Sequence, residues 1–289
     1  MTWFFLAIGM AIGTAGVRVV NQMYRINGLY LVIFSRFILL LVTLPLALTW
    51  PWPDSPSFYL STLATVPLVL YLDQRVFNLC AEYGGGPVSR LEPMNHVLTF
   101  IIWGLAQMMI VGFSFEAPIR TGIIFASIAG CCLFAFEMRR GEISAQVLKN
   151  MVPVIVVMTV TVIFSKLAMD FTDRPGDVAI YIFLQSVLLC LVGAGYFTLG
   201  RQWPKSKDLT PSFYKAIGLV AIFALVHMGF KSSAFRVVDN PAYVTVLDLT
   251  APLWILLYNR LSHYPDNIKV LPGLGIVVCV AVLLLATNL

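Results

Sequence analysis

Ionisable side chains inside apolar stretches are where this chain could bind a charged solute or move a proton. Glu92 and His96 are four residues apart, so on a helix they share one face, and Asn95 lies beside them. A carboxylate next to an imidazole can take up and release protons. The alternative is an internal hydrogen bond that locks two helices together.

A second pair with the same spacing lies in the other half of the chain. His227 and Lys231 are four residues apart and correspond to Gln74 and Asn78 in the first half, so each half presents two polar groups on one helix face. A polar cavity wall is the simplest interpretation. The alternatives are a neutral, hydrogen-bonded core imidazole for His227 and, for Lys231, a flexible side chain that reaches the membrane interface.

Asp248 holds the position in the second half that Glu92 holds in the first. Pro252, one turn later, frees a backbone carbonyl that a cavity could use. Ionisable groups inside a membrane span cost several kcal/mol unless they face a wet cavity or a partner. Both carboxylates are therefore expected to act in function, and with His227 they are the candidates for proton coupling.

The basic candidates complete the predicted site. Arg75 is expected to reach a carboxylate such as Glu92 or Asp248, either as a gate that substrate opens or as a static pair. Asp73, on a different helix face, is expected to pair with another span. The candidate substrate-binding residues are Arg75, Asn78, Glu92, Asn95, His96, Lys166, His227, Lys231 and Asp248.

Composition indicates the elements that must position these groups. Of 289 residues, 59% are hydrophobic and 11% charged, whereas soluble domains carry about a quarter charged residues. Each crossing of a bilayer needs about 20 apolar residues. The apolar runs predict an all-α integral membrane protein with about ten transmembrane helices, centred near Ile8, Leu39, Val69, Ile101, Ile128, Val157, Leu188, Leu225, Leu253 and Val278.

Other classes of protein lack their sequence signals. The first apolar run is expected to be a span and not a signal peptide, because no basic segment precedes it. The five cysteines lie in apolar runs without ligand spacing to histidine, which predicts neither a disulfide nor a metal site. No phosphate loop, zinc motif or nucleophile elbow occurs in the sequence. We expect no enzyme activity, no cofactor and no binding of nucleic acid.

The two halves of the chain resemble one another, with residues 1–140 and 141–289 as five-helix repeats. An odd number of crossings inverts the second repeat, which predicts a pseudo-two-fold axis in the membrane plane and a solute site between the halves. The aligned pairs are Arg18 with Lys166, Arg36 with Gln185, and Glu92 with Asp248. For Arg18 and Arg36, near the ends of predicted spans, a structural or interfacial role is favoured.

Loop charge predicts an orientation. One side carries Arg25, Arg139, Arg140, Lys149, Arg201, Lys205, Lys207, Lys215, Arg260 and Lys269, and the other carries Arg120, Arg174 and Arg236. The first side is expected to be cytoplasmic, which places both termini outside. The expected location is the inner (plasma) membrane of a bacterium.

These features resemble the drug/metabolite transporter superfamily, in particular its ten-span branch with tandem EamA-type repeats. The resemblance covers nearly the whole chain. It lies in Lys166, in Ser35-Arg36 opening the second span, and in Gly84-Gly85-Gly86-Pro87 leading to Leu91-Glu92-Pro93. Gln185 departs from the family pattern, which has an arginine there. The resemblance implies a transporter fold and a transport function, and it leaves the substrate open.

The leading hypothesis is a secondary transporter that moves a small polar metabolite, zwitterionic or carboxylate-bearing, by alternating access coupled to protons. Lys231, Arg75 or Lys166 would hold the carboxylate, and Glu92 or Asp248 the amine. One alternative is an exporter of organic cations, with Tyr71, Trp103, Tyr243 or Trp254 supplying ring faces. Another is a structural membrane subunit. The expected partners are the solute and membrane lipid, and a homodimer is compatible with the sequence.

Overall fold

The computed structural model describes residues 2–84, 88, 94–96, 98–99, 101–103, 118–137, 145–200, 203–205, 208–262 and 270–288. Within these ranges every regular element is a helix. The helices are α1 (Thr2–Tyr24), α2 (Gly28–Thr49), α3 (Pro56–Tyr83), α6 (Pro118–Glu137), α7 (Ala145–Asp170), α8 (Asp177–Gly200), α9 (Pro211–Val237), α10 (Pro241–Leu247), the 3-10 turn η2 (Asp248–Thr250), α11 (Ala251–Leu261) and α12 (Val270–Asn288). Each predicted span centre lies in helical residues.

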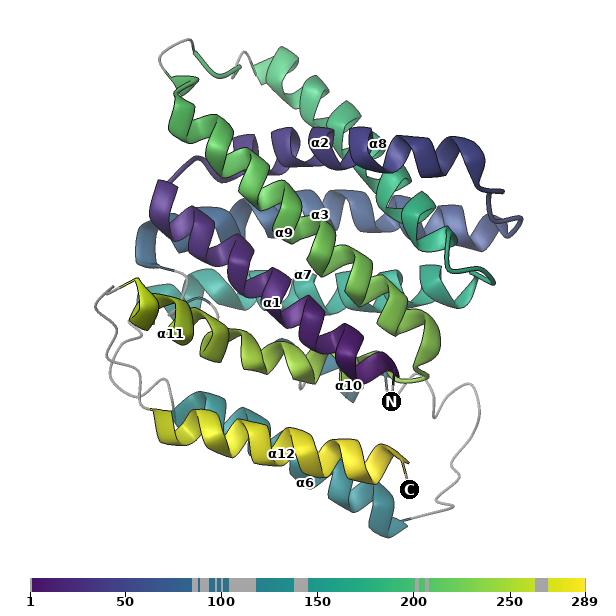
Figure 1. Cartoon of the computed structure of the whole chain (residues 1–289), viewed down its shortest axis with the longest axis vertical. Helices are drawn as coiled ribbons and strands as arrows, with labels where there is room; N and C mark the ends of the chain where they lie inside the picture. Colours follow the sequence, from purple (N-terminus) through teal and green to yellow (C-terminus); the bar gives the residue numbers. More distant parts are fainter. Residues whose placement is uncertain are drawn as a thin grey trace.

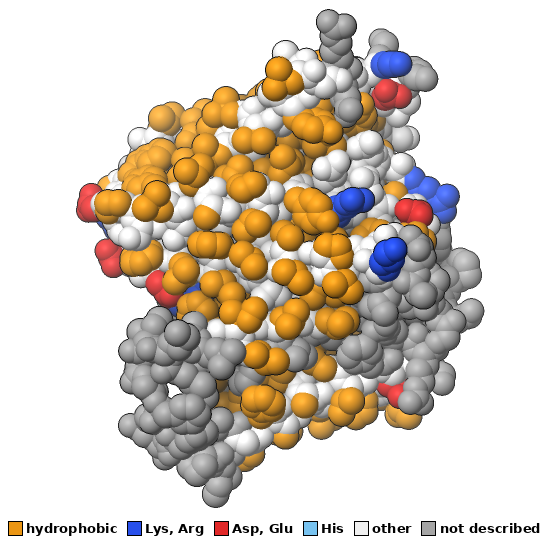
Figure 2. All heavy atoms as spheres, turned by 180° about the vertical axis from the view of Figure 1, so that it is seen from behind, with side chains coloured by type: hydrophobic (Ala, Val, Ile, Leu, Met, Phe, Trp, Pro, Cys, Tyr) orange, Lys and Arg blue, Asp and Glu red, His pale blue; other side chains and the backbone are white. Residues whose placement is uncertain are grey.

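Six helical segments of the described chain are long and apolar enough to cross a membrane: Thr2–Tyr24, Gly28–Thr49, Lys149–Asp170, Asp177–Gly200, Pro211–Val237 and Pro241–Leu261. Hydrophobic side chains cover most of the face seen in Figure 2, and charged side chains gather mainly toward its two lateral edges. The helices run across the width between those edges (Figure 1). The architecture agrees with the predicted all-α multi-pass membrane protein.

Local signals in the sequence set where several helices begin. Asn27 caps α2, because its Oδ1 accepts a hydrogen bond of 2.9 Å from Leu29 N. Asn240 caps α10 in the same way through Ala242 N. Proline stands in the first turn of α3, α9, α10 and α11, where a missing N–H costs nothing because the first amides of a helix have no partner within it.

Helices that are distant in sequence pack as pairs. The closest pairs are α1 with α9, α3 with α7, α2 with α8, and α6 with α12. Figure 1 shows α6 and α12 lying along one another at one end of the molecule. These pairs bring the two halves of the chain together through most of the bundle.

Three glycines let α1 approach α9. Gly9, Gly13 and Gly16 face α9, and small residues at such spacing allow membrane helices to pack backbone against backbone. At Gly13 a Cβ would lie 2.6 Å from the backbone N of His227, a contact that no side-chain movement can relieve. The α1–α9 contact therefore fixes the position of His227.

Candidate functional site

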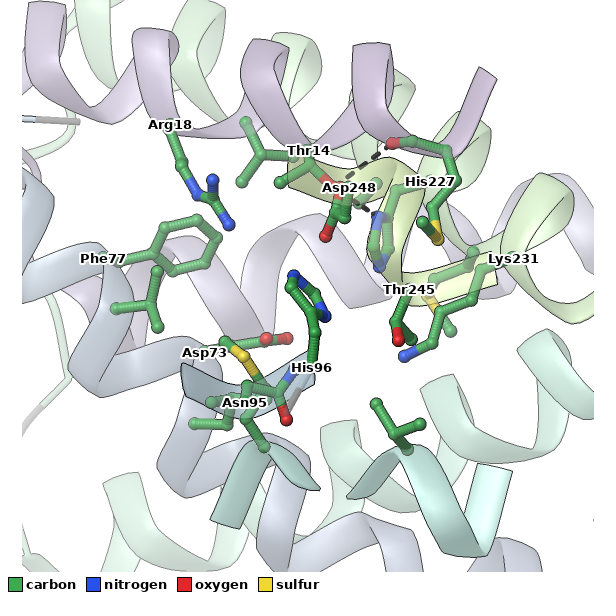
Figure 3. Close-up of a pocket in the computed structure, with 18 of the residues that line it drawn as sticks. Thr14, Arg18, Asp73, Phe77, Asn95, His96, His227, Lys231, Thr245 and Asp248 are labelled. Atoms are coloured by element: carbon green, nitrogen blue, oxygen red, sulfur yellow. Dashed lines mark hydrogen bonds between the residues drawn. The ribbon is translucent and has the colours of Figure 1, made fainter. Parts of the chain in front are cut away.

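A cavity of about 130 Å³ lies where α1, α2, α3, α7, α9, α10 and η2 meet (Figure 3). This volume has room for several water molecules. The polar members of its wall among the described residues are Thr14, Arg18, Arg36, Asp73, Asn95, His96, His227, Lys231, Thr245 and Asp248. Both halves of the chain contribute to this set.

His227 is oriented by a threonine on the neighbouring helix. Thr14 Oγ1 lies 2.8 Å from His227 Nδ1 and also donates to Met10 O at 3.2 Å. A hydroxyl has one proton. When that proton bonds Met10 O, His227 donates from Nδ1, and its Nε2 is left as an acceptor.

Asp248 begins a short 3-10 turn inside a continuous helical segment. α10 ends at Leu247, η2 begins at Asp248, and α11 follows from Ala251. Pro252 has no N–H, so it cannot donate a hydrogen bond to the Asp248 carbonyl. This carbonyl accepts instead from Ala251 N–H, so the carbonyl freed by the proline is already used. The side chain points into the cavity beside His227 (Figure 3). Its Oδ1 is buried and has no hydrogen-bond partner within the described ranges.

His96 and Asn95 reach the cavity from the opposite side (Figure 3). Asn95 Oδ1 accepts from Thr159 Oγ1 at 2.9 Å, which holds the amide against α7. His96 is 2% exposed, and neither of its ring nitrogens has a hydrogen-bond partner in the part of the chain described. A buried polar group without a partner is costly, so the imidazole is available to a ligand or to water.

The basic groups give the described wall a positive surplus. Arg18, Arg36 and Lys231 are basic, and Asp73 and Asp248 are acidic. The Lys231 ammonium lies 5.5 Å from the centre of the Phe235 ring, and no hydrogen bond from it is found within the described residues. Lys231 thus keeps its donors for a ligand.

Arg36 ties four helices together in the cavity wall. Its Nη2 donates to Asp73 Oδ2 at 2.7 Å, and its Nη1 donates to Gln185 Oε1 at 3.2 Å and to Met228 Sδ. Gln185 in turn donates to Thr65 Oγ1 at 2.9 Å. The network joins α2 to α3, α8 and α9. It also neutralises Asp73, one of the two carboxylates in the described cavity wall.

The cavity brings together Asn95, His96, His227, Lys231 and Asp248 from the predicted set. Three other predicted residues lie elsewhere, and Glu92 is outside the described residues.

Arg75 is exposed, with its guanidinium 5.8 Å from the centre of the Tyr71 ring. Asn78 Oδ1 accepts from Gly28 N at 2.8 Å and so holds the start of α2. Lys166 bonds Asp170 and donates to Phe235 O at 3.0 Å.

Five polar residues of the described wall were absent from the predicted binding set: Thr14, Arg18, Arg36, Asp73 and Thr245. Thr14 and Arg18 are four apart on α1, the same spacing that drew attention to His227 and Lys231. Arg36 is 6% exposed and lies well inside α2, not at its end. Asp73 was expected to pair with another span, and it pairs with Arg36 on α2.

Thr14→Val is expected to lower the free energy of unfolding by about 1 kcal/mol, because interhelical hydrogen bonds in membranes are worth roughly that much. Thr43→Val is the matched control, since buried Thr43 bonds only to carbonyls of its own helix, Leu39 and Leu40. Denaturation of both variants in mixed micelles measures the difference. Equal stabilities for the two variants would mean that the Thr14–His227 contact contributes nothing.

The described wall offers both hydrogen-bond acceptors and donors to a ligand. Asp248 Oδ1 is an acceptor, and Lys231 and Arg18 are donors, all facing one small space. Comparison with models of protein families and with curated proteins found no match to the chain. The function is therefore inferred from the site's own chemistry.

Proposed function

We propose that this chain is a secondary transporter of a small zwitterionic or carboxylate-bearing metabolite, built from two inverted five-helix repeats. The observation that carries the proposal is a cavity inside an apolar helical bundle, walled by polar groups of both halves, in which the His96 ring and Asp248 Oδ1 have no hydrogen-bond partner among the described residues. Polar groups at membrane depth are costly and mark solute or ion pathways.

The pairing of helices supports the inverted repeat. Exchanging the halves turns α1 into α7, α2 into α8, α3 into α9 and α6 into α12. Under this exchange the α1–α9 pair becomes α7–α3, and the pairs α2–α8 and α6–α12 become themselves. Arg36 hydrogen-bonds Gln185, its aligned counterpart, as residues beside a two-fold axis would. The proposal includes the drug/metabolite transporter resemblance, with repeats at 1–140 and 141–289.

The 3-10 turn at Asp248 supports a binding role. A stretch of 3-10 helix inside a longer helix often marks a functional hinge or strain. Asp248 lies in the middle of the segment Pro241–Leu261, and its Oδ1 has no hydrogen-bond partner among the described residues. Asp248 and His227 are also the described groups that could carry a coupled proton.

The substrate follows from the unused groups and the volume. Asp248 Oδ1 suits an ammonium group, and Lys231 suits a carboxylate. An apolar cavity of about 150 Å³ holds benzene in another protein, so about 130 Å³ fits a solute of similar size, such as an amino acid with a short side chain. Export of organic cations has less support, because Tyr71, Trp103, Tyr243 and Trp254 are not among the described residues of the wall.

Asp248→Asn is expected to weaken binding of alanine or serine about tenfold, equal to 1.4 kcal/mol, because the ammonium loses a charged partner. A thermal-shift titration of purified protein in detergent measures this, since ligand binding raises apparent stability. Propionate, which lacks the amine, should bind the parent weakly, and Asp248→Asn should lower its affinity little further. Ethylamine, which lacks the carboxylate, should likewise bind the parent weakly, and Lys231→Gln should lower its affinity little further.

Asp170→Asn is the matched control, because Asp170 bonds Lys166 and does not line the cavity. This variant should bind amino acids like the parent. Unchanged affinity in Asp248→Asn would remove Asp248 from the site, and competition by a quaternary amine would favour the exporter of organic cations.

A further inference from the structure

A second and larger cavity lies away from the polar one. It has a volume of about 360 Å³ and lies between the first turns of α1, the helix α11 and the helix α12. Its wall includes Phe4 and Ile8 of α1, Leu253 and Trp254 of α11, and Val277 and Val280 of α12. None of these residues takes part in the site described above.

The described wall offers a polar ligand no free side-chain group to bind. Thr250 is the hydroxyl-bearing member of the described wall, and its Oγ1 already donates to Leu247 O at 2.8 Å. The Trp254 Nε1 atom is covered by protein, so the ring presents carbon to the cavity. Water needs two to four polar partners to occupy a cavity, so water does not account for this volume.

The packing of α12 explains why the space exists. α12 packs mainly on α6, and it also contacts η2, α10 and Leu253 of α11. Figure 1 shows the α6–α12 pair set beside α11 as a separate layer. The crevice lies between Pro241–Leu261, which is long and apolar enough to cross a membrane, and the shorter apolar helix Leu271–Leu283 of α12. In a membrane the solvent around such helices is hydrocarbon.

We propose that this crevice binds one acyl chain of a membrane phospholipid. Protein interiors contain few voids larger than a water molecule, and hydrocarbon is the material that the surroundings supply at this depth. The chain would wedge between α11 and the α6–α12 pair. It would also contact Leu247 and Thr250, on either side of Asp248, and so touch the back of the 3-10 turn. The site is independent of the proposed transport function.

The test uses Trp254 as a reporter in the full-length chain. Trp3, Trp50, Trp52, Trp103 and Trp203 are replaced by phenylalanine, which leaves Trp254 as the single tryptophan. The protein is reconstituted into phosphatidylcholine vesicles with and without bromine midway along the acyl chain. Bromine quenches tryptophan on contact, so the proposal predicts strong loss of Trp254 fluorescence in the brominated vesicles.

Two neighbouring substitutions separate a chain inside the crevice from lipid around the protein. Val277→Phe fills the crevice, whereas Val278→Phe adds the same ring beside it at a residue that is 61% exposed and outside the wall. Val277→Phe should lose most of the quenching, and Val278→Phe should keep it. Val277→Leu gives a smaller filling residue if the phenylalanine variant does not fold.

Native mass spectrometry of the unaltered chain provides a second readout. The parent should retain one phospholipid through delipidation that strips bulk lipid, and the filled variant should lose it. Absence of quenching in the parent, or equal quenching in the Val277 and Val278 variants, would overturn the proposal.

Discussion

Replacing Arg36 with methionine is expected to lower the free energy of unfolding by about 3 kcal/mol, the lower end of the range for breaking a buried ion pair. The lower end applies because the Asp73 side chain keeps 27% of its exposure, whereas the side chain of Arg36 keeps 7%. The substitution leaves the Asp73 carboxylate without its cation at 2.7 Å and Gln185 Oε1 without its donor. Methionine keeps the apolar contacts of the arginine stem.

A double-mutant cycle with Asp73→Asn isolates the pair. The asparagine removes the stranded charge, so the double variant should be more stable than Arg36→Met alone. Unfolding in mixed micelles, followed by circular dichroism, gives the four free energies. Strictly additive losses would mean that the two side chains do not interact and that the network is not a structural tie.

Gly13→Ala is expected to lower the free energy of unfolding by about 2 kcal/mol, in the range for overpacking. The new Cβ would lie 2.6 Å from His227 N and 2.9 Å from Phe223 O, and backbone atoms cannot rotate away. Intrinsic helix propensity alone would raise stability by up to about 1 kcal/mol. The sign of the change therefore tests the close α1–α9 contact.

Gly229→Ala is the control for Gly13→Ala, because a Cβ at Gly229 meets nothing within 4 Å. This variant should be as stable as the parent or more so. The Gly13 variant should also bind the amino-acid probes more weakly, since displacing α9 moves His227. Equal stabilities for the two alanine variants would contradict the packing described for α1.

The sequence could predict the helices and one side of the site because both follow from local patterns. Long apolar runs set the helices. The four-residue spacing of His227 and Lys231 placed both on the face that lines the cavity. The 3-10 turn at Asp248 agrees with a local signal as well, since Pro252 cannot continue the pattern of helical hydrogen bonds.

The rest of the site depends on contacts between residues far apart in sequence. Asn78 caps the start of α2 because Gly28 lies fifty residues earlier in the chain and beside it in space. Lys166 and its aligned residue Arg18 have different surroundings, because Asp170 and the Phe235 carbonyl bind Lys166 outside the cavity. No pattern within one helix reveals a partner on another helix.

Solute exchange in proteoliposomes tests the central proposal of a transporter most directly. Vesicles containing the purified chain are loaded with unlabelled alanine or serine and diluted into the same labelled amino acid. We expect transient accumulation of label that Asp248→Asn abolishes and Asp170→Asn preserves. If the parent binds these amino acids but exchanges none of them, or if Asp248→Asn exchanges as fast as the parent, the cavity is not a transport site.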